Sequence, residues 1–277
     1  MKTINCNGLL IDLSKPKVMG IINVTPDSFY DGGKTTKQNS ILHQAEKMLS
    51  EGATFLDVGG YSSRPNATDI STEEEISRVV PAIESILKQF PEVLISVDTF
   101  RSNVANEAVK AGACIVNDIS GGTLDPAMFS TVAKLKAPYI LMHMRGTPQT
   151  MVQQTNYDDV IKEVIYFFSE RVAQARQTGI NDIIIDPGFG FAKTKEQSFE
   201  LLQKSALLKQ LDLPILTGVS RKSMIYKTLD ISAKEALNGT TVLNTLALQK
   251  GTSILRVHDV KEAVECIKLT EMLNPYL

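Results

Sequence analysis

Polar and charged residues stand at the end of nearly every short apolar run in this sequence. The runs are rich in isoleucine and valine, a composition typical of strands that are buried on both faces. The residues in question are Asn23, Asp57, Asp98, Asn117, His143, Asp186, Ser220 with Arg221 and Lys222, and Arg256 with His258. Turns need polar residues, which explains one such position, but three carboxylates at strand ends are costly unless they have partners or ligands. The pattern therefore predicts a binding site built from strand ends.

The residue types fall into two sets with different chemistry. One set combines carboxylates, an amide and a cation, and consists of Asp98, Asn117, Asp186 and Lys222. It suits a flat heterocycle with N–H donors and a carbonyl group, because a carboxylate accepts two N–H bonds side by side. The other set combines a neutral oxygen with cations, and consists of Asn23, Arg64, Arg256 and His258. It suits a phosphorylated group with Mg²⁺, which takes hard oxygen ligands.

Several of these residues have a structural role open to them as well. Asp57 precedes two glycines and is expected to tie down a loop rather than to contact a ligand. Arg221 is open to pairing with a neighbouring acid, and His143 to being hydrogen-bonded at the mouth of the site. Phe189 and Phe191 suit packing as well as stacking.

Composition narrows the class of protein. The chain has 277 residues, 43% of them hydrophobic and 22% charged, with a net charge of −2. This charge gives no general attraction to nucleic acid or membranes. Cysteines are three and widely spaced, which indicates a reducing compartment and no metal cluster. The beginning of the sequence lacks the apolar core of a signal peptide, and no apolar run is long enough to cross a bilayer. We therefore expect a cytoplasmic protein.

Strand and helix patterns alternate along the chain. A β-hairpin is expected at about 3–14, with its turn at Asn7–Gly8. The expected strands are 18–23, 55–58, 94–98, 115–118, 139–142, 183–185, 215–217 and 254–257. The expected helices are 36–51, 71–89, 101–111, 126–135, 158–177, 195–209, 232–249 and 260–273. Eight such units without a linker predict one domain over 1–277, a closed (β/α)8 TIM barrel at about 16–273 preceded by the hairpin.

Eight segments of the sequence resemble the dihydropteroate synthase family of pterin-binding TIM barrels. In order they are 20–33 (GIINVTPDSFYDGG), 57–67 (DVGGYSSRPNA), 96–99 (SVDT), 116–122 (VNDISGG), 141–147 (LMHMRGT), 186–192 (DPGFGFA), 218–223 (GVSRKS) and 256–259 (RVHD). Each lies at a predicted strand end. The resemblance implies a transferase of folate biosynthesis that joins p-aminobenzoate to 6-hydroxymethyl-7,8-dihydropterin diphosphate and releases pyrophosphate. It also implies a target of sulfonamides and a homodimer, with the C-terminal helices as the expected contact.

The resemblance also implies roles for individual residues. The pterin would be bound by Asp98, Asn117, Asp186 and Lys222. Asn23 would ligate Mg²⁺ together with the diphosphate, which Arg256 and His258 would bind. The p-aminobenzoate site would be shaped by Phe29, Ser63, Arg64, Pro65, Phe191 and Ser220. The residues expected to act in catalysis are Asp98, Lys222, Arg256 and His258.

The sequence departs from the common family pattern at four positions, which are Tyr61, Ser63, Asn66 and Ala192. None of the implied ligands is lost by these changes. Two alternatives to the synthase remain. One is a pterin-binding methyltransferase domain, against which the SRKS, NVTPDSF and RVHD segments argue. The other is a non-catalytic pterin-binding paralogue, against which the retention of Asn23, Arg256 and His258 argues.

Overall fold

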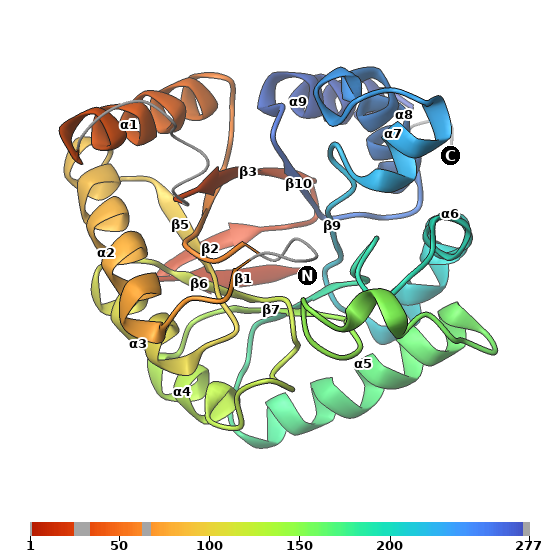
Figure 1. The fold of residues 1–277 in the computed structure, drawn as a ribbon, viewed down its shortest axis with the longest axis horizontal. Coiled ribbons are helices and arrows are strands. Elements are labelled where there is room, and N and C mark those ends of the chain that lie inside the picture. The colour runs from red at the N-terminus through yellow and green to blue at the C-terminus, as the bar shows by residue number, and fades with distance from the viewer. Residues whose placement is uncertain (1, 25–33, 63–67, 274–277) are drawn as a thin grey trace.

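The computed structural model describes residues 2–24, 34–62 and 68–273. A parallel sheet lies at the centre, surrounded by helices (Figure 1). Its strands are β3 (Lys17–Asn23), β4 (Phe55–Gly59), β5 (Leu94–Asp98), β6 (Ile115–Asp118), β7 (Tyr139–Met142), β8 (Ile183–Asp186), β9 (Leu216–Thr217) and β10 (Ile254–Val257). They are ordered β8-β7-β6-β5-β4-β3-β10-β9, and a parallel bridge between Ile185 and Ile215 joins the two ends. The predicted (β/α)8 barrel is confirmed.

The helices of the described residues lie outside the sheet. They are α1 (Lys34–Ser50), α2 (Thr72–Gln89), α3 (Ser102–Lys110), α4 (Met128–Leu135), α5 (Val160–Gln177), α6 (Lys195–Lys204), α7 (Ser223–Leu229), α8 (Leu237–Gln249) and α9 (Val260–Glu271). None of them is both long and apolar enough to cross a membrane.

Three helical segments differ from the sequence prediction. The helix expected at 195–209 is α-helical only to Lys204 and continues as a 3-10 helix, Ser205–Leu211. The helix expected at 232–249 begins with a short 3-10 turn, Ala233–Glu235, and becomes α8 only at Leu237. No helix was expected between the strand at 215–217 and residue 232, yet α7 lies there; it is followed by Asp230 in a left-handed conformation (φ 54°). Because α7 starts at Ser223, the residue before it, Lys222, is its N-cap. The short strand β9 is therefore connected to α8 through an additional helix.

The predicted hairpin is confirmed and covers the N-terminal end of the barrel. β1 (Thr3–Cys6) pairs with β2 (Leu9–Asp12) in antiparallel fashion. Asn7 and Gly8 both have positive φ, as a two-residue hairpin turn requires. The hairpin places Ile4 and Cys6 in one apolar cluster with the lower barrel interior. This end of the barrel is closed by apolar packing, so only the opposite end is open to chemistry.

The barrel interior changes from apolar to polar along the strands. The apolar cluster under the hairpin includes Phe55, Ile115, Ile184 and Ile254. Side chains alternate between the two faces of a strand, so the residues two positions later also face inward. These residues are Asp57, Asn117, Asp186 and Arg256. The strand period thus places a layer of polar side chains directly above the apolar floor.

Candidate active site at the barrel mouth

Arg256 lies between two carboxylates in the polar layer. Its Nε donates to Asp57 Oδ2 at 2.6 Å, and its Nη2 donates to Asp98 Oδ2 at 2.6 Å. Asn117 Nδ2 donates to the same Asp57 oxygen at 2.9 Å. The hydrogen bonds of Asp57 thus join side chains of β6 and β10, whereas a contact with a loop was expected.

Burial and charge set the ionisation of this group. Burial raises the pKa of Asp98 to about 7, although Arg256 opposes the shift. Burial lowers the pKa of Arg256, but the carboxylates of Asp57 and Asp98 outweigh it and leave the pKa raised. Arg256 is thus a permanent cation, whereas Asp98 is close to its titration point at neutral pH.

A second pair of opposite charges flanks the mouth at β8. Lys222 Nζ donates to the Phe189 carbonyl at 2.6 Å and lies 4.7 Å from the centroid of the Phe191 ring. Asp186 Oδ1 accepts the N–H of Gly188 at 2.8 Å. Burial lowers the pKa of Lys222 to about 8 and raises that of Asp186, and the two charges oppose both shifts. The pair offers one acceptor edge and one donor to a flat ligand.

The loops after β9 and β10 are joined to each other by side-chain hydrogen bonds. Ser220 Oγ lies 3.0 Å from His258 Nδ1 and accepts the backbone N–H of His258 at 3.2 Å. Arg221 donates to both oxygens of Asp259 at 2.9 and 2.7 Å, which confirms the structural pairing considered for it. It adopts a left-handed φ of 55°. The Arg221–Asp259 ion pair thus joins the same two loops next to the contact between Ser220 and His258.

His143 is hydrogen-bonded, as the structural alternative for it predicted, and its partner is a residue that the sequence did not indicate. Lys193 Nζ lies 2.8 Å from His143 Nδ1, and both side chains are buried. Burial lowers the pKa of His143 well below its usual range, with Lys193 contributing. The imidazole is therefore neutral at pH 7.

Asp118 is another buried carboxylate that the sequence analysis did not single out. Its carboxylate accepts hydrogen bonds from the Tyr139 hydroxyl at 2.6 Å, the Ser120 N–H at 2.7 Å and the Gly122 N–H at 2.8 Å. Residues 118–122 read DISGG, a pattern typical of a turn in which the aspartate carboxylate accepts the backbone N–H two residues later. That spacing is the signal that would have identified it. Asp118 shapes the loop after β6.

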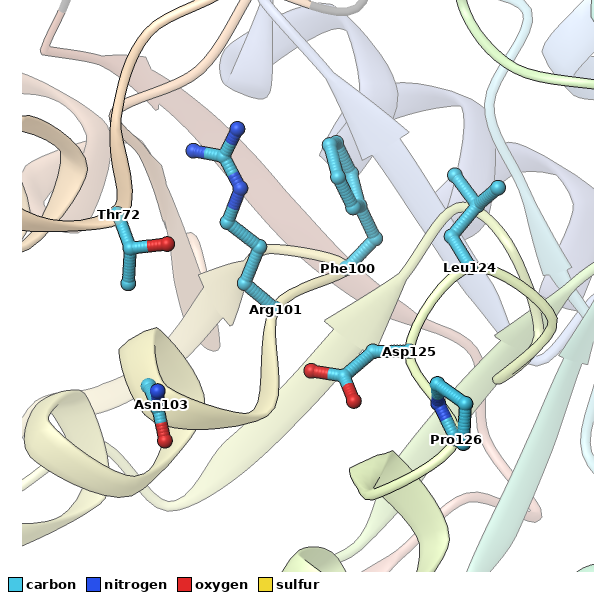
Figure 2. Close-up of a pocket in the computed structure, with 7 residues that line it drawn as sticks. All are labelled: Thr72, Phe100, Arg101, Asn103, Leu124, Asp125 and Pro126. Carbon is cyan, nitrogen blue, oxygen red and sulfur yellow. The ribbon is translucent and has the colours of Figure 1, made fainter.

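A pocket beside the mouth, between the starts of α2, α3 and α4, is shown in Figure 2. It is lined by Thr72, Phe100, Arg101, Asn103, Leu124, Asp125 and Pro126. Phe100 and Arg101 extend side by side, with the guanidinium carbon 5.3 Å from the ring centroid. Arg101 donates to the buried Glu75 at 2.8 Å and to Asp69 at 3.1 Å. Because Arg101 is paired with two acids, this pocket offers no excess positive charge to an anion.

Some predicted site residues are not placed by the structure. Phe29, Ser63, Arg64, Pro65 and the substituted Asn66 lie outside the described residues. Two other substituted positions are described. Tyr61 is buried and accepts a hydrogen bond from Gln149 Nε2 at 2.7 Å, and Ala192 has a left-handed φ of 49°. Asn23 ends β3, where its register partner on β4 is Gly59.

Comparisons with known proteins agree with this geometry. Residues 19–258 match the family model described as pterin binding enzyme. Dihydropteroate synthase of Escherichia coli is 44% identical over 266 residues, covering 95% of this chain and 94% of that protein. Among solved structures, Yersinia pestis dihydropteroate synthase in a sulfonamide drug complex has a TM-score of 0.92 at 40% identity, covering 99% of both chains. The Xanthomonas albilineans dihydropteroate synthase with 4-aminobenzoic acid has a TM-score of 0.92 at 38% identity, covering 98% of both chains.

Proposed function

The chain belongs to the dihydropteroate synthases of the pterin binding enzyme family, and on that premise we propose how its barrel mouth works. The reaction joins p-aminobenzoate to 6-hydroxymethyl-7,8-dihydropterin diphosphate, giving 7,8-dihydropteroate and pyrophosphate. One observation supports it best: acceptors for a flat heterocycle and cations for a diphosphate share one polar layer, with Arg256 hydrogen-bonded to Asp98. A substrate that combines a pterin ring with a diphosphate fits both halves of that layer.

The pterin end would be recognised by Asp186, Lys222 and Asn117. The carboxylate of Asp186 keeps Oδ2 for the N–H edge of the ring, since Oδ1 accepts the backbone of Gly188. Lys222 has hydrogens beyond the one that it gives to the Phe189 carbonyl, and these suit a ring oxygen or nitrogen. The acid therefore acts in recognition and not as a base.

Replacement of Asp186 or Lys222 by alanine is expected chiefly to weaken pterin binding. A hydrogen bond to a charged group contributes about 1.5–3 kcal/mol, so each variant should bind a pterin about 10- to 100-fold more weakly. Titration calorimetry with a pterin measures the change, and Glu84→Ala on the outer face of α2 serves as a control. Binding unchanged in both variants would contradict the assignment.

The diphosphate end would be held by Arg256 and His258. As the C–O bond to the diphosphate breaks, its electron pair leaves with pyrophosphate and positive charge develops on the pterin methylene carbon. The carboxylate of Asp98 would stabilise that charge. The p-aminobenzoate nitrogen, neutral at pH 7, then forms the new C–N bond and releases its proton to solvent, so no strong base is needed. Ser220 and Phe191 would border the p-aminobenzoate.

Magnesium is part of the proposal, and the donor chemistry suits it. The side-chain oxygen of Asn23 is a hard neutral ligand of the kind that Mg²⁺ takes. In residues 2–24, 34–62 and 68–273 no group of three or more His, Cys, Asp or Glu side chains is placed to hold a metal ion. The substrate diphosphate would therefore supply the charged ligands beside Asn23. Bound there, the ion would neutralise charge on the departing pyrophosphate.

A coupled assay of pyrophosphate release tests the reaction. Sustained release over many turnovers is expected only with both substrates and Mg²⁺ present, and it should stop when EDTA removes the metal. Pyrophosphate release in single turnovers without p-aminobenzoate would support departure of pyrophosphate before the amine attacks. No release under any condition would overturn the proposed function, and methyl transfer to a corrinoid protein would favour the methyltransferase alternative.

We propose further that the protein is a cytoplasmic homodimer whose contact lies on the C-terminal helices. Large apolar side chains are exposed there: Val242 and Leu246 on α8, Leu269 on α9, and Met272 just after it. Leu269→Glu is expected to convert the dimer to monomers, because a charge in an apolar interface lacks a partner. Sedimentation velocity measures this, with the exposed hairpin variant Leu10→Glu as control. A Leu269→Glu dimer of unchanged stability would contradict this contact.

A further inference from the structure

Lys193 is a buried amine that takes no part in the proposed reaction. Its side chain is directed into the loop between β8 and α6 rather than into solvent, and only 7% of the residue is exposed. Nζ lies 3.0 Å from the Gly188 carbonyl, 3.0 Å from the Phe191 carbonyl and 2.8 Å from His143 Nδ1. A fourth acceptor, the His143 carbonyl, lies farther away at 3.5 Å. The three nearer contacts are enough for the three donors of an ammonium group.

The loop around Lys193 has a backbone that needs support. Gly188, Gly190 and Ala192 all have positive φ, at 67°, 77° and 49°. Glycine adopts this conformation readily, whereas the Cβ of alanine disfavours it. The Phe191 N–H closes a turn onto the Gly188 carbonyl at 3.1 Å. Lys193 therefore bonds to both ends of a turn whose next residue is strained.

The Gly188 carbonyl and N–H connect Lys193 to the pterin side of the mouth. The N–H of Gly188 donates to Asp186 Oδ1 while its carbonyl accepts from Lys193. Gly188 also passes so close to β7 that an added Cβ would lie 2.1 Å from the His143 carbonyl oxygen. The position of Asp186 at the mouth is thus coupled, through one glycine, to the buried amino group of Lys193.

Phe191 connects Lys193 to the p-aminobenzoate side. Its carbonyl accepts from Lys193, and its ring lies against the ammonium group of Lys222. Lys222 binds the same loop by a different carbonyl, that of Phe189. Two lysines therefore hold this loop: Lys222 reaches it from the mouth, and Lys193 from within the protein.

We propose that Lys193 is a positioning residue which orients Asp186 and Phe191 together, so that one buried group sets the binding geometry for both substrates. The proposal rests on the proposed function for its kinetic consequences. It does not depend on the protonation state of Lys193, because a neutral amine would still donate to the two carbonyls and accept from His143. Burial removes the amino group of Lys193 from water, and the Gly188 and Phe191 carbonyls of one loop supply hydrogen bonds in place of those to water.

The variant Lys193→Met tests the proposal, since methionine fills a similar volume without donating hydrogen bonds. Lys195→Met is the matched control, because Lys195 lies two residues on and its side chain is 41% exposed. We expect Lys193→Met to bind a pterin about tenfold more weakly and to raise KM for p-aminobenzoate about tenfold, with kcat within about twofold of the wild type. The reason is that the loop of the variant is no longer held in its binding conformation and must be ordered when a substrate binds. Lys195→Met should match the wild type.

Hydrogen exchange supplies a readout that does not depend on catalysis. The amide of Phe191 in Lys193→Met should exchange at least about tenfold faster than in the wild type, while the amides of α6 stay protected. If Lys193→Met does not fold, Lys193→Gln retains an amide donor and should show smaller shifts in the same direction. A wild type inactive with both substrates would overturn the proposed function but not the exchange result. Unchanged exchange, or unchanged pterin binding and KM values with only a lower melting temperature, would overturn the proposal.

Discussion

Replacement of Arg256 by methionine is expected to lower the free energy of unfolding by about 3–5 kcal/mol at pH 8 and to abolish pyrophosphate release. The guanidinium group is the cation that contacts both Asp57 and Asp98, each at 2.6 Å. Asp57 is fully buried, so its carboxylate would be left without a counter-charge. Urea denaturation measures the first effect, and the coupled pyrophosphate assay the second.

The matched control is Arg256→Lys, which keeps the charge but not the planar fork. An ammonium group is a point charge and does not reproduce the separate Nε and Nη2 bonds to two carboxylates. We expect this variant to recover most of the stability but little of the turnover. A methionine variant within about 1 kcal/mol of the wild type would show that the two carboxylates tolerate the loss, contrary to the cost of an unpaired buried charge.

The loss in Arg256→Met should depend on pH in a defined direction. The pKa of Asp98 is raised to about 7 by burial, so between about pH 4 and 7 the folded state holds a proton that the unfolded state has lost. Its contribution to stability is therefore present at low pH and declines as pH rises, by up to about 1.4 kcal/mol per pH unit. Without Arg256 the pKa rises further and the decline extends to higher pH. The part of the destabilisation that comes from Asp98 should thus make the loss smaller at pH 5 than above pH 8.

Strand ends were the part of this protein that the sequence predicted well. Asp98, Asn117, Asp186 and Arg256 were all expected at one mouth, and parallel strands with a period of two bring them there. That inference needed only local patterns, because burial on both faces makes a strand conspicuous and a charge at its end unusual. The hairpin at Asn7–Gly8 was equally local and was also confirmed.

Contacts between distant segments were not predictable in the same way. Lys193 was not predicted to have a role, because nothing in its neighbourhood indicates that His143, 50 positions earlier, provides an acceptor. The pairing of Arg256 with Asp98 joins residues that the sequence assigned to different halves of the substrate. The helix α7 was missed because serine and lysine at 220–223 were interpreted as ligand residues, whereas Lys222 is also a helix N-cap.

Asp98→Asn is expected to reduce kcat about 100- to 1000-fold while weakening pterin binding by less than about tenfold. The amide has the shape of the carboxylate and keeps an oxygen for the ring or for Arg256, so ground-state contacts change little. It carries no negative charge, however, and the positive charge on the pterin methylene exists only near the transition state. Loss of kcat without a matching loss of affinity is the signature of such an interaction. Single-turnover kinetics and calorimetry measure the two quantities separately.

The pH profile distinguishes this role from a structural one. If ionised Asp98 stabilises the cation, kcat of the wild type should rise with pH through an apparent pKa near 7, the value to which burial raises this carboxyl group. The asparagine variant should lack that step, and above pH 7 it should also be more stable than the wild type, since an ionised buried carboxylate is gone. Ser96→Ala, on the same strand and buried, is the control and should keep the wild-type profile. An Asp98→Asn enzyme that retains both the step and a kcat within about threefold of the wild type would contradict direct stabilisation of the cation by this carboxylate.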